Sequence, residues 1–356
     1  MGRVMGIEDL AAGLDDLTRN REALALLILK GPQAVPVLSK VLLGPPSPIP
    51  EPRCLAAEGL GAIGGEAAVT ALIRVLRLHE LRSLDAVLRL AEEAVRNRAA
   101  EQLGRLGDRR AVESLLLALA HDGVREAMGA LARFGEKRAI PPIVRRLEDP
   151  CDRAAAAEAL LAFGTAASPA LLATLTEHRP SAEDEAPMSV ERRAEAARLL
   201  GDLGEKTALA PLCASLADPR AAVQLEAGLA LLRLALADAP DPALVIVAHG
   251  IGHPSVPVGL RCADALVAAG DRGIPHLLSM GGPRTAPADH PPQPSDDALQ
   301  TMAIEVLERI GTDASAQAIE GFLQDRSSLV HGRARRALHH LGVVASDRSG
   351  RRGVGA

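Results

Sequence analysis

The stretch RNRAAEQLGRLGDRRAVESLLLALAHD, residues 96–122, recurs along the chain and decides its fold. Its copies align on a shared anchor position, which is Gly107 in this stretch. Leucine stands four residues before the anchor in all ten copies, and alanine stands eight residues before it in all but one, where Cys262 replaces it. This recurrence indicates a repeated structural unit rather than a single catalytic motif. The anchors are Gly31, Gly64, Gly107, Gly135, Gly164, Gly204, Ala235, Gly270, Gly311 and Gly342.

Each copy predicts a hairpin of two helices. The positions eight, four and one residue before the anchor share one face of a helix, so this face packs inward. The anchor glycine then ends the helix, because glycine adopts the left-handed conformation at little cost. A second apolar helix follows, often with proline in its first turn, as at Pro141 and Pro211. We call the two the Arg-Ala-Ala helix and the Pro-Leu-Leu helix, and we predict an all-α chain whose stacked hairpins form an α-solenoid.

The repeat also resembles a known family. Residues 95–119 (VRNRAAEQLGRLGDRRAVESLLLAL), 193–219 and 152–164 are similar to HEAT repeats of the short bacterial type related to phycocyanobilin lyases. The resemblance covers most of residues 20–342 and implies a superhelix of nine or ten hairpins, with residues 1–342 forming a single solenoid. It also implies that the Arg-Ala-Ala helices line the concave face. Such a motif specifies the fold strongly and the function weakly.

The conspicuous polar residues of the quoted stretch belong to this framework. Asp108 begins the next helix, and the spacing Gly104-x-x-Gly107 recurs in other copies, which favours close packing and helix capping over phosphate binding. The counterparts of Arg96 are Arg53, Arg153 and Arg193. The stretch is therefore interpreted as one structural unit and not as a site.

Composition limits the classes of function. The chain has 356 residues with no Trp, no Tyr and three Phe, so its core is built from Ala, Leu, Val and Ile and offers little to an aromatic ligand cage. A formal net charge of −5 lacks the basic excess of a dedicated nucleic-acid binder. No segment resembles a signal peptide, and no uninterrupted apolar run reaches the roughly 18 residues of a transmembrane helix. We therefore expect a cytoplasmic protein without a membrane span.

The pattern provides no convincing metal, cofactor or catalytic group. The four cysteines have no metal-binding or redox spacing, and Cys213 and Cys262 occupy apolar positions of the repeat, so we interpret both as packing residues. His249 and His253 lie in a Gly-Ile-Gly-His-Pro loop that has no carboxylate to complete a metal site. The HEAT-like diiron deoxyhypusine hydroxylases carry repeated His-Glu pairs, and this chain has one. We therefore assign no catalytic, cofactor-binding or metal residue and predict a chain that is not an enzyme.

The exposed face of the Arg-Ala-Ala helices is the candidate binding surface. The positions nine, six and two residues before each anchor form a stripe on this face. The stripe carries both charges along nearly its whole length, whereas a groove for a phosphate backbone would be mostly basic. Mixed charges suit a polypeptide partner, and they would equally form solvated pairs within each helix. The residues assigned to protein binding are Arg98, Glu101, Arg105, Glu126, Arg133, Glu158, Glu195 and Arg198.

Two other features are candidate surfaces. A basic C-terminal patch consists of Arg333, Arg335, Arg336 and His340, and it precedes residues 343–356, which we expect to be a disordered basic tail. Inserted loops lie near residues 44–52, 77–94, 176–190 and 281–296. Each insertion follows a Pro-Leu-Leu helix and precedes an Arg-Ala-Ala helix, so the insertions should decorate one rim of the solenoid.

The sequence favours a non-catalytic adaptor, scaffold or regulatory subunit that binds a protein partner in the concave groove. Two alternatives stay open. One is a bilin-lyase-like chaperone-transferase, which the resemblance suggests, and the other is nucleic-acid binding through the basic C-terminal patch. We expect that reversing the charges of Arg98, Arg105 and Arg133 together abolishes partner binding and leaves thermal unfolding nearly unchanged.

Overall fold

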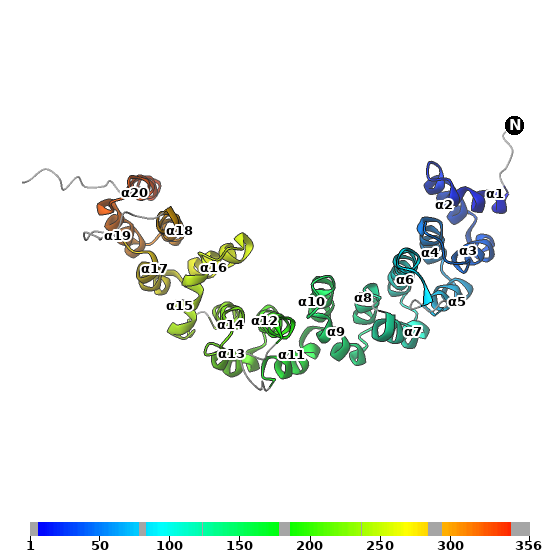
Figure 1. Ribbon diagram of the computed structural model, residues 1–356, viewed down its shortest axis with the longest axis horizontal. Helices are drawn as coiled ribbons and strands as arrows, with labels where there is room; N and C mark the ends of the chain where they lie inside the picture. Colours follow the sequence, from blue (N-terminus) through cyan, green and yellow to red (C-terminus); the bar gives the residue numbers. More distant parts are fainter. Residues whose placement is uncertain are drawn as a thin grey trace, which may run out of the picture. The chain divides into compact units, whose positions relative to one another are not determined.

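A computed structural model describes residues 6–77, 83–122, 124–177, 186–235, 237–283 and 294–342. Figure 1 numbers the α-helices along the chain, and several of them are preceded or followed by a short 3₁₀ helix. The typical unit is an Arg-Ala-Ala helix, a tight turn at the anchor, and a Pro-Leu-Leu helix. This order confirms the helical hairpin that the repeat predicts.

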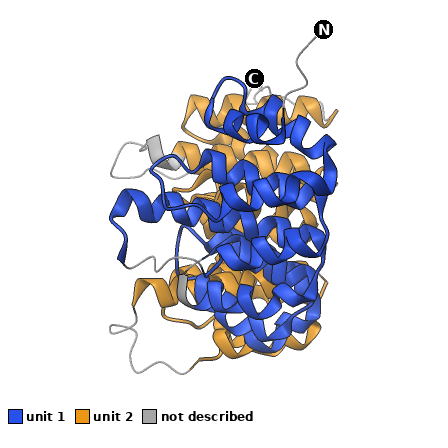
Figure 2. Ribbon diagram, turned by 90° about the vertical axis from the view of Figure 1, so that its right-hand side faces the viewer, with its two compact units in different colours: residues 1–171 blue, residues 172–356 orange. Residues whose placement is uncertain are grey.

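Two compact units divide the chain, residues 1–171 and residues 172–356 (Figure 2). The first contains α1 (Ile7–Ala12), α2 (Asn20–Leu29), α3 (Val35–Leu42), α4 (Glu51–Ile63), α5 (Glu66–Val75), α6 (Ala86–Leu106), α7 (Val112–Leu117), α8 (Glu126–Arg133), α9 (Ile140–Arg146) and α10 (Arg153–Phe163). Helix α11 (Ser168–Leu175) contains the boundary. The second contains α12 (Pro187–Asp202), α13 (Leu209–Ser215), α14 (Ala221–Leu234), α15 (Asp241–Gly250), α16 (Val256–Ala269), α17 (Ile274–Gly281), α18 (Pro294–Ile310), α19 (Asp313–Gly321) and α20 (Ser328–His340). That one solenoid runs continuously through residues 1–342 stays a prediction.

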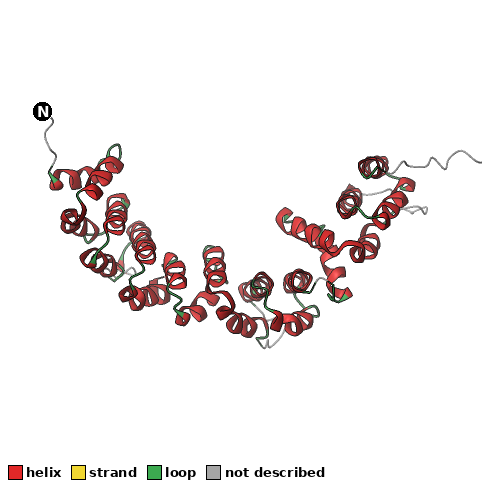
Figure 3. Ribbon diagram, turned by 180° about the vertical axis from the view of Figure 1, so that it is seen from behind, coloured by secondary structure: helices red, strands yellow, loops and turns green. Residues whose placement is uncertain are grey.

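Each unit is built from two layers of helices, and the part of the chain that the structure describes contains no β-strand (Figure 3). In the first unit the Arg-Ala-Ala helices α2, α4, α6, α8 and α10 pack side by side in chain order (Figure 1). In the second unit α12, α14, α16, α18 and α20 do the same, and the Pro-Leu-Leu helices form the other layer. The all-α solenoid fold is therefore confirmed.

The repeated positions build the core and end the helices. The leucines four residues before the anchors are at most 1% exposed, and the residues eight before them are at most 6% exposed. All nine anchor glycines have φ between 60° and 71°, the left-handed region in which a helix ends easily only at glycine. Ala235, which replaces glycine in one copy, has φ −143°, so α14 ends without this turn.

Glycines inside the Arg-Ala-Ala helices allow close helix packing. A Cβ atom at Gly104 of α6 would lie 2.9 Å from the Cβ of Ala130 in α8. A Cβ at Gly201 of α12 would lie 2.8 Å from that of Ala230 in α14. Since real Cβ atoms do not approach so closely, these helix pairs depend on the missing side chain. Packing and capping thus account for the recurring Gly-x-x-Gly.

The framework arginines bind the preceding helix of the stack. Arg53 donates from Nε to the carbonyl oxygen of Leu42 at 2.9 Å, and Arg153 donates from Nε to that of Leu147 at 2.9 Å. Both carbonyls lie at the end of a Pro-Leu-Leu helix, where backbone acceptors lack helical partners. Arginine at this position of the repeat therefore has a structural role, as the sequence indicated.

Two of the four arginines at this position of the repeat, Arg53 and Arg193, form buried ion pairs. Arg53 Nη1 lies 2.5 Å from Glu92 Oε2, and Arg193 Nη1 lies 2.8 Å from Asp218 Oδ2. The side chains of both pairs are at most 6% exposed. Breaking such a pair is costly, because the remaining charge would stay buried without its partner.

Parts of the predicted insertions are helical. Residues 86–94, assigned above to an inserted loop, form the first turns of α6, because Asp85 caps this helix by accepting a hydrogen bond from the Leu88 backbone N–H at 2.9 Å. Helices α12 and α18 likewise begin inside insertions, at Pro187 and Pro294. Residues 78–82, 178–185, 284–293 and 343–356 lie outside the described residues. The common rim and the basic tail therefore stay predictions.

Among the described residues, one span, Arg153–Leu175, is long and apolar enough to cross a membrane by length and composition alone. It consists of α10, a short 3₁₀ helix and α11, and Gly164 between them has φ 61°. Because the chain turns at this glycine, the span is the two helices of one repeat and not one continuous helix.

Candidate functional site

The predicted stripe of the first unit is a chain of ion pairs across three helices. Arg98 of α6 pairs with Glu58 of α4 (Nε–Oε1, 3.3 Å) and with Glu101 of its own helix (Nη1–Oε2, 2.8 Å). Arg105 pairs with the other oxygen of Glu101 at 2.7 Å. Arg21 of α2 pairs with Glu58 at 2.8 Å. The charges therefore connect neighbouring repeats as well as turns of one helix.

A hollow of about 450 Å³ lies along this chain of ion pairs, lined by residues of α2, α4 and α6. Its apolar lining includes Leu24, Ile28 and Leu106, and its charged lining is Glu58, Arg98 and Arg105. Gln102 adds an amide, and Gly61 and Ala62 complete the lining on the α4 side. The volume falls within the range of ligand pockets. The hollow can thus accept an apolar side chain and pair charges beside it.

The other predicted stripe residues of the first unit are exposed. Glu126 and Arg133 begin and end α8, and Glu158 lies on α10. Among the described residues, these three side chains form no ion pair or hydrogen bond. Arg133 lies across α6, since its Nη1 is 3.2 Å from the point where a Cβ at Gly104 would stand. The structure therefore brings Arg133 beside the C-terminal end of the α6 stripe.

The first turns of α6 extend the stripe with apolar residues, which the sequence analysis missed. Val87 is 60% exposed and Leu90 is 66% exposed. Val87 precedes Arg105 by eighteen residues, which is five full turns at 3.6 residues per turn, so the two share one side of the helix. Residues 86–94 lack the repeat pattern. The helical spacing of apolar residues such as Val87 and Leu90 is the signal that could have predicted a helix here.

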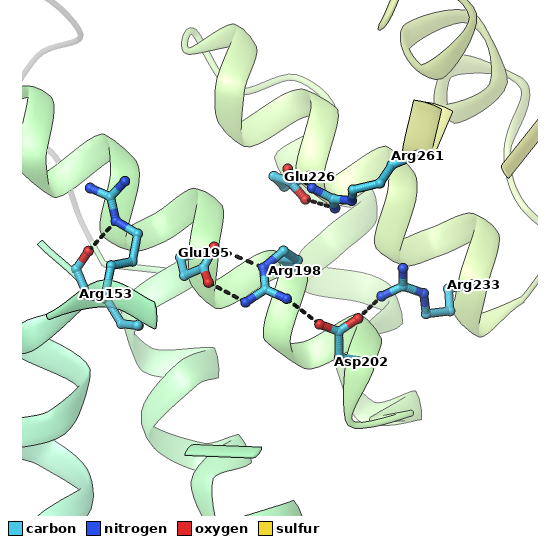
Figure 4. Close-up of polar contacts among 8 residues, drawn as sticks. Arg153, Glu195, Arg198, Asp202, Glu226, Arg233 and Arg261 are labelled. Atoms are coloured by element: carbon cyan, nitrogen blue, oxygen red, sulfur yellow. Dashed lines mark hydrogen bonds and ion pairs between the residues drawn. The ribbon is translucent and has the colours of Figure 1, made fainter. Parts of the chain in front are cut away.

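In the second unit, several charged side chains of the corresponding stripe form ion pairs with one another. Asp202 of α12 connects Arg198 of its own helix to Arg233 of α14. The pairs of this region are Glu195–Arg198, Arg198–Asp202, Asp202–Arg233 and Glu226–Arg261 (Figure 4). A smaller hollow of about 260 Å³ is lined by residues of α14 and α16. The predicted residues Glu195 and Arg198 therefore lie together and already neutralise each other.

The basic C-terminal patch is partly neutralised by Glu308 of α18. Arg333 Nη1 lies 2.6 Å from Glu308 Oε2, and His340 Nδ1 lies 2.7 Å from Oε1. Burial acts to raise the pKa of Glu308, but hydrogen bonds from His340 and Arg333 outweigh it and lower that pKa. Arg335 and Arg336 are exposed on α20. Two of the four predicted patch residues thus already have a carboxylate partner.

The cysteines divide into two buried and two exposed thiols. Burial raises the pKa of Cys54 and of Cys262 to about 11. The prediction that Cys213 is a packing residue is wrong, because its side chain is exposed. Leu212 of α13 and Ala208, which directly precedes this helix, are buried in the core, and the residue after Leu212 faces solvent.

No metal centre is evident among the described residues, where no group of three or more His, Cys, Asp or Glu side chains could hold an ion. The Nδ1 atom of His249 lies 2.8 Å from the carbonyl oxygen of Val245, and His253 Nδ1 accepts a hydrogen bond from the Ser255 N–H at 3.0 Å. Both rings therefore contact the local backbone.

Comparison with known families identifies the repeats. Residues 52–77, 95–121, 124–149 and 192–218 match the family described as PBS lyase HEAT-like repeat. Four repeats of the chain therefore match phycocyanobilin-lyase-like HEAT repeats, as the resemblance indicated. Comparison with curated proteins finds no match.

Solved structures of low sequence identity share the architecture. A mutant of the karyopherin Kap121p with seven substitutions has a TM-score of 0.51 at 16% identity, over 96% of this chain and 45% of that chain. A Kap121p mutant with three substitutions has a TM-score of 0.50 at 16% identity, over 96% and 46%. This chain thus spans less than half of Kap121p, and the likeness shows the fold alone. The complex of CpcE and CpcF of phycocyanin lyase from Nostoc sp. PCC7120 has 19% identity over 96% of both chains, but its TM-score of 0.27 carries no argument.

Proposed function

We propose that this chain is a non-catalytic adaptor or scaffold that binds a polypeptide on the exposed stripe of its Arg-Ala-Ala helices. The principal contact is the hollow lined by α2, α4 and α6. The observation that supports this most is the combination, in one hollow, of an apolar lining and charges of both signs. Protein interfaces have this composition, because a few buried apolar anchors provide most of the affinity and a polar rim surrounds them.

The charge pattern favours a polypeptide over a nucleic acid. Glu58 and Glu101 lie within the same chain of ion pairs as the arginines, and Glu158 is exposed on α10. A phosphate backbone gains affinity by releasing counterions at each neutralised phosphate, and carboxylates on the same surface oppose that gain. A polypeptide can place side chains of either charge against this surface.

Charge reversal at Arg105 and Arg133 tests the proposal. Both side chains are exposed, so Arg105→Glu with Arg133→Glu should weaken binding of a protein partner about tenfold or more and change the free energy of unfolding by only about 0.5 kcal/mol. The measurement is the affinity for a partner recovered from lysate of the source organism and then purified. Arg98 is unsuitable for this test, contrary to the sequence expectation. Its reversal would bring a carboxylate beside Glu58 and Glu101 and destabilise the fold.

Matched controls exist on the other layer. Arg74 of α5 and Arg145 of α9 are exposed and have no ion pair among the described residues. Arg74→Glu with Arg145→Glu makes the same change in net charge and should leave binding intact. Ile28→Arg, which fills the hollow, should weaken binding as the stripe variant does. A purified partner that binds both stripe variants as tightly as the parent chain contradicts the proposal.

A further inference from the structure

We propose that the first unit recognises an acidic segment of its partner, which places carboxylates on Arg105 and Arg133 and an apolar side chain in the hollow of α2, α4 and α6. This inference rests on the proposed function and adds the chemistry of the ligand. Three observations lead to it: the exposed cation in which the series of ion pairs ends, the position of Arg133, and the apolar lining of the hollow beside Arg105.

The ion pairs of the stripe run from Glu51, which pairs with Arg21 at 3.5 Å, to Arg105, so the series ends in a cation. Glu101 is shared between Arg98 and Arg105, and Glu58 is shared between Arg98 and Arg21. Arg105 is the last member of this series, and its side chain is 62% exposed. Its guanidinium therefore has donor groups directed to solvent, because one carboxylate oxygen satisfies only part of the five-donor fork.

Arg133 adds a second cation at the same place. It belongs to the next helix, α8, and its Nη1 lies 3.2 Å from the point where a Cβ at Gly104 would stand, one residue before Arg105. It has no ion pair among the described residues. Exposed arginines from two neighbouring helices thus lie at the same end of the stripe, and each guanidinium can bind a carboxylate through its two-nitrogen fork.

The equivalent positions of the second unit differ in their carboxylate partners. Two residues before the anchors, Arg233 pairs with Asp202, Arg309 pairs with Asp264 at 2.6 Å, and His340 lies 2.7 Å from an oxygen of Glu308. Arg233 and Arg309 thus each have a carboxylate from a neighbouring helix, and Glu308 contacts the His340 ring. At this position of the repeat Arg133 differs, because it has no ion pair among the described residues.

Apolar surface next to the arginines fixes the rest of the ligand. Leu106 follows Arg105 directly and lines the hollow together with Ile28 of α2. Exposed Glu126 lies seven residues from Arg133 along α8, about 10 Å at 1.5 Å per residue. Because Glu126 repels carboxylates, the acidic groups of the ligand bind at the C-terminal ends of α6 and α8, where Arg105 and Arg133 lie. An apolar residue of the ligand occupies the adjacent hollow.

The experiment selects short random peptides displayed on phage against the full chain. We expect enriched peptides to combine two or more acidic residues with a bulky apolar residue, and their affinity to fall as NaCl is raised. In fluorescence anisotropy, Arg105→Glu with Arg133→Glu should weaken these peptides about tenfold or more. Arg74→Glu with Arg145→Glu should leave them unchanged, and Ile28→Arg should weaken them.

The outcomes separate this inference from the proposed function. Basic or uncharged peptides that Ile28→Arg weakens and the arginine pair does not affect would overturn the inference and leave the hollow as a polypeptide site. Absence of any peptide that Ile28→Arg weakens would overturn both. A single-stranded DNA oligonucleotide that binds more tightly than every selected peptide, and is lost in the same arginine variant, would replace the acidic segment with a nucleic acid.

Discussion

In five of the ten copies, the side chain eleven residues before the anchor performs the same task with different chemistry. It donates to, or in the case of histidine contacts, a carbonyl oxygen at or just beyond the end of the preceding Pro-Leu-Leu helix. The contacts are Arg53 to Leu42 at 2.9 Å, Arg153 to Leu147 at 2.9 Å, Gln224 to Asp218 at 2.6 Å, Gln300 to Gly282 at 2.7 Å and His331 to Leu323 at 2.8 Å. Arginine is one solution among three, because the requirement is a long side chain with a nitrogen that reaches unsatisfied carbonyls.

Removing one member of a buried pair tests this structural role. Arg193→Met removes the guanidinium that pairs with the buried Asp218 carboxylate, so the free energy of unfolding should fall by about 3 kcal/mol. The urea midpoint measures the change. Arg193→Met with Asp218→Asn removes the uncompensated charge and should recover part of the loss. Equal midpoints for the single and double variants would contradict this explanation.

The cysteines provide a second residue-scale test. Thiol reactivity depends on the thiolate, and a pKa of about 11 leaves about one molecule in a thousand ionised at pH 8 for Cys54 and Cys262. Burial also blocks access to both. Ellman's reagent should therefore react rapidly with Cys151 and Cys213, and with the other two thiols only after unfolding. Cys213→Ser should remove one rapid equivalent, and four rapid equivalents in the native chain would contradict the assignment.

At the scale of the helix, two glycines of the Arg-Ala-Ala layer differ in how much space surrounds them. Gly104 of α6 faces Ala130 so closely that a Cβ would lie 2.9 Å from its side chain, whereas a Cβ at Gly129 of α8 would meet nothing within 4 Å. Gly104→Ala should therefore destabilise by about 1–3 kcal/mol through overpacking. Gly129→Ala should stabilise by about 1 kcal/mol through helix propensity. Urea unfolding of the two variants measures both signs, and a shared sign would refute the packing argument.

The elements also show why the fold was predictable and the site only in part. Helix ends and core faces depend on local signals, such as the leucine four residues before the anchor, which recurs in all ten copies, and the anchor glycine, which recurs in nine. The hollow depends on how α2, α4 and α6 pack together. The sequence of a single repeat therefore could not predict that Ile28 lines the hollow or that Glu58 pairs with Arg21. The first turns of α6 lie outside the repeat, and their sequence predicts a loop instead of a helix.

On the scale of the whole molecule, stability should follow the division into two units. In a solenoid each repeat contacts only its neighbours, so destabilisation spreads over a limited distance. Leu103 in the first unit and Leu307 in the second are each 0% exposed and occupy the same position of the repeat. Truncating either to alanine removes a comparable amount of buried surface, about 2–5 kcal/mol in cost.

Hydrogen exchange on the full chain distinguishes local from global effects. With Leu103→Ala, protection should fall in α4, α6 and α8 and stay near the parent values in α16, α18 and α20. With Leu307→Ala the pattern should reverse. The helices concerned are in direct contact within each unit, which is why the loss should spread among them first. If either substitution lowers protection equally in both sets of helices, the chain unfolds as one cooperative body, and the two units are not separate units of stability.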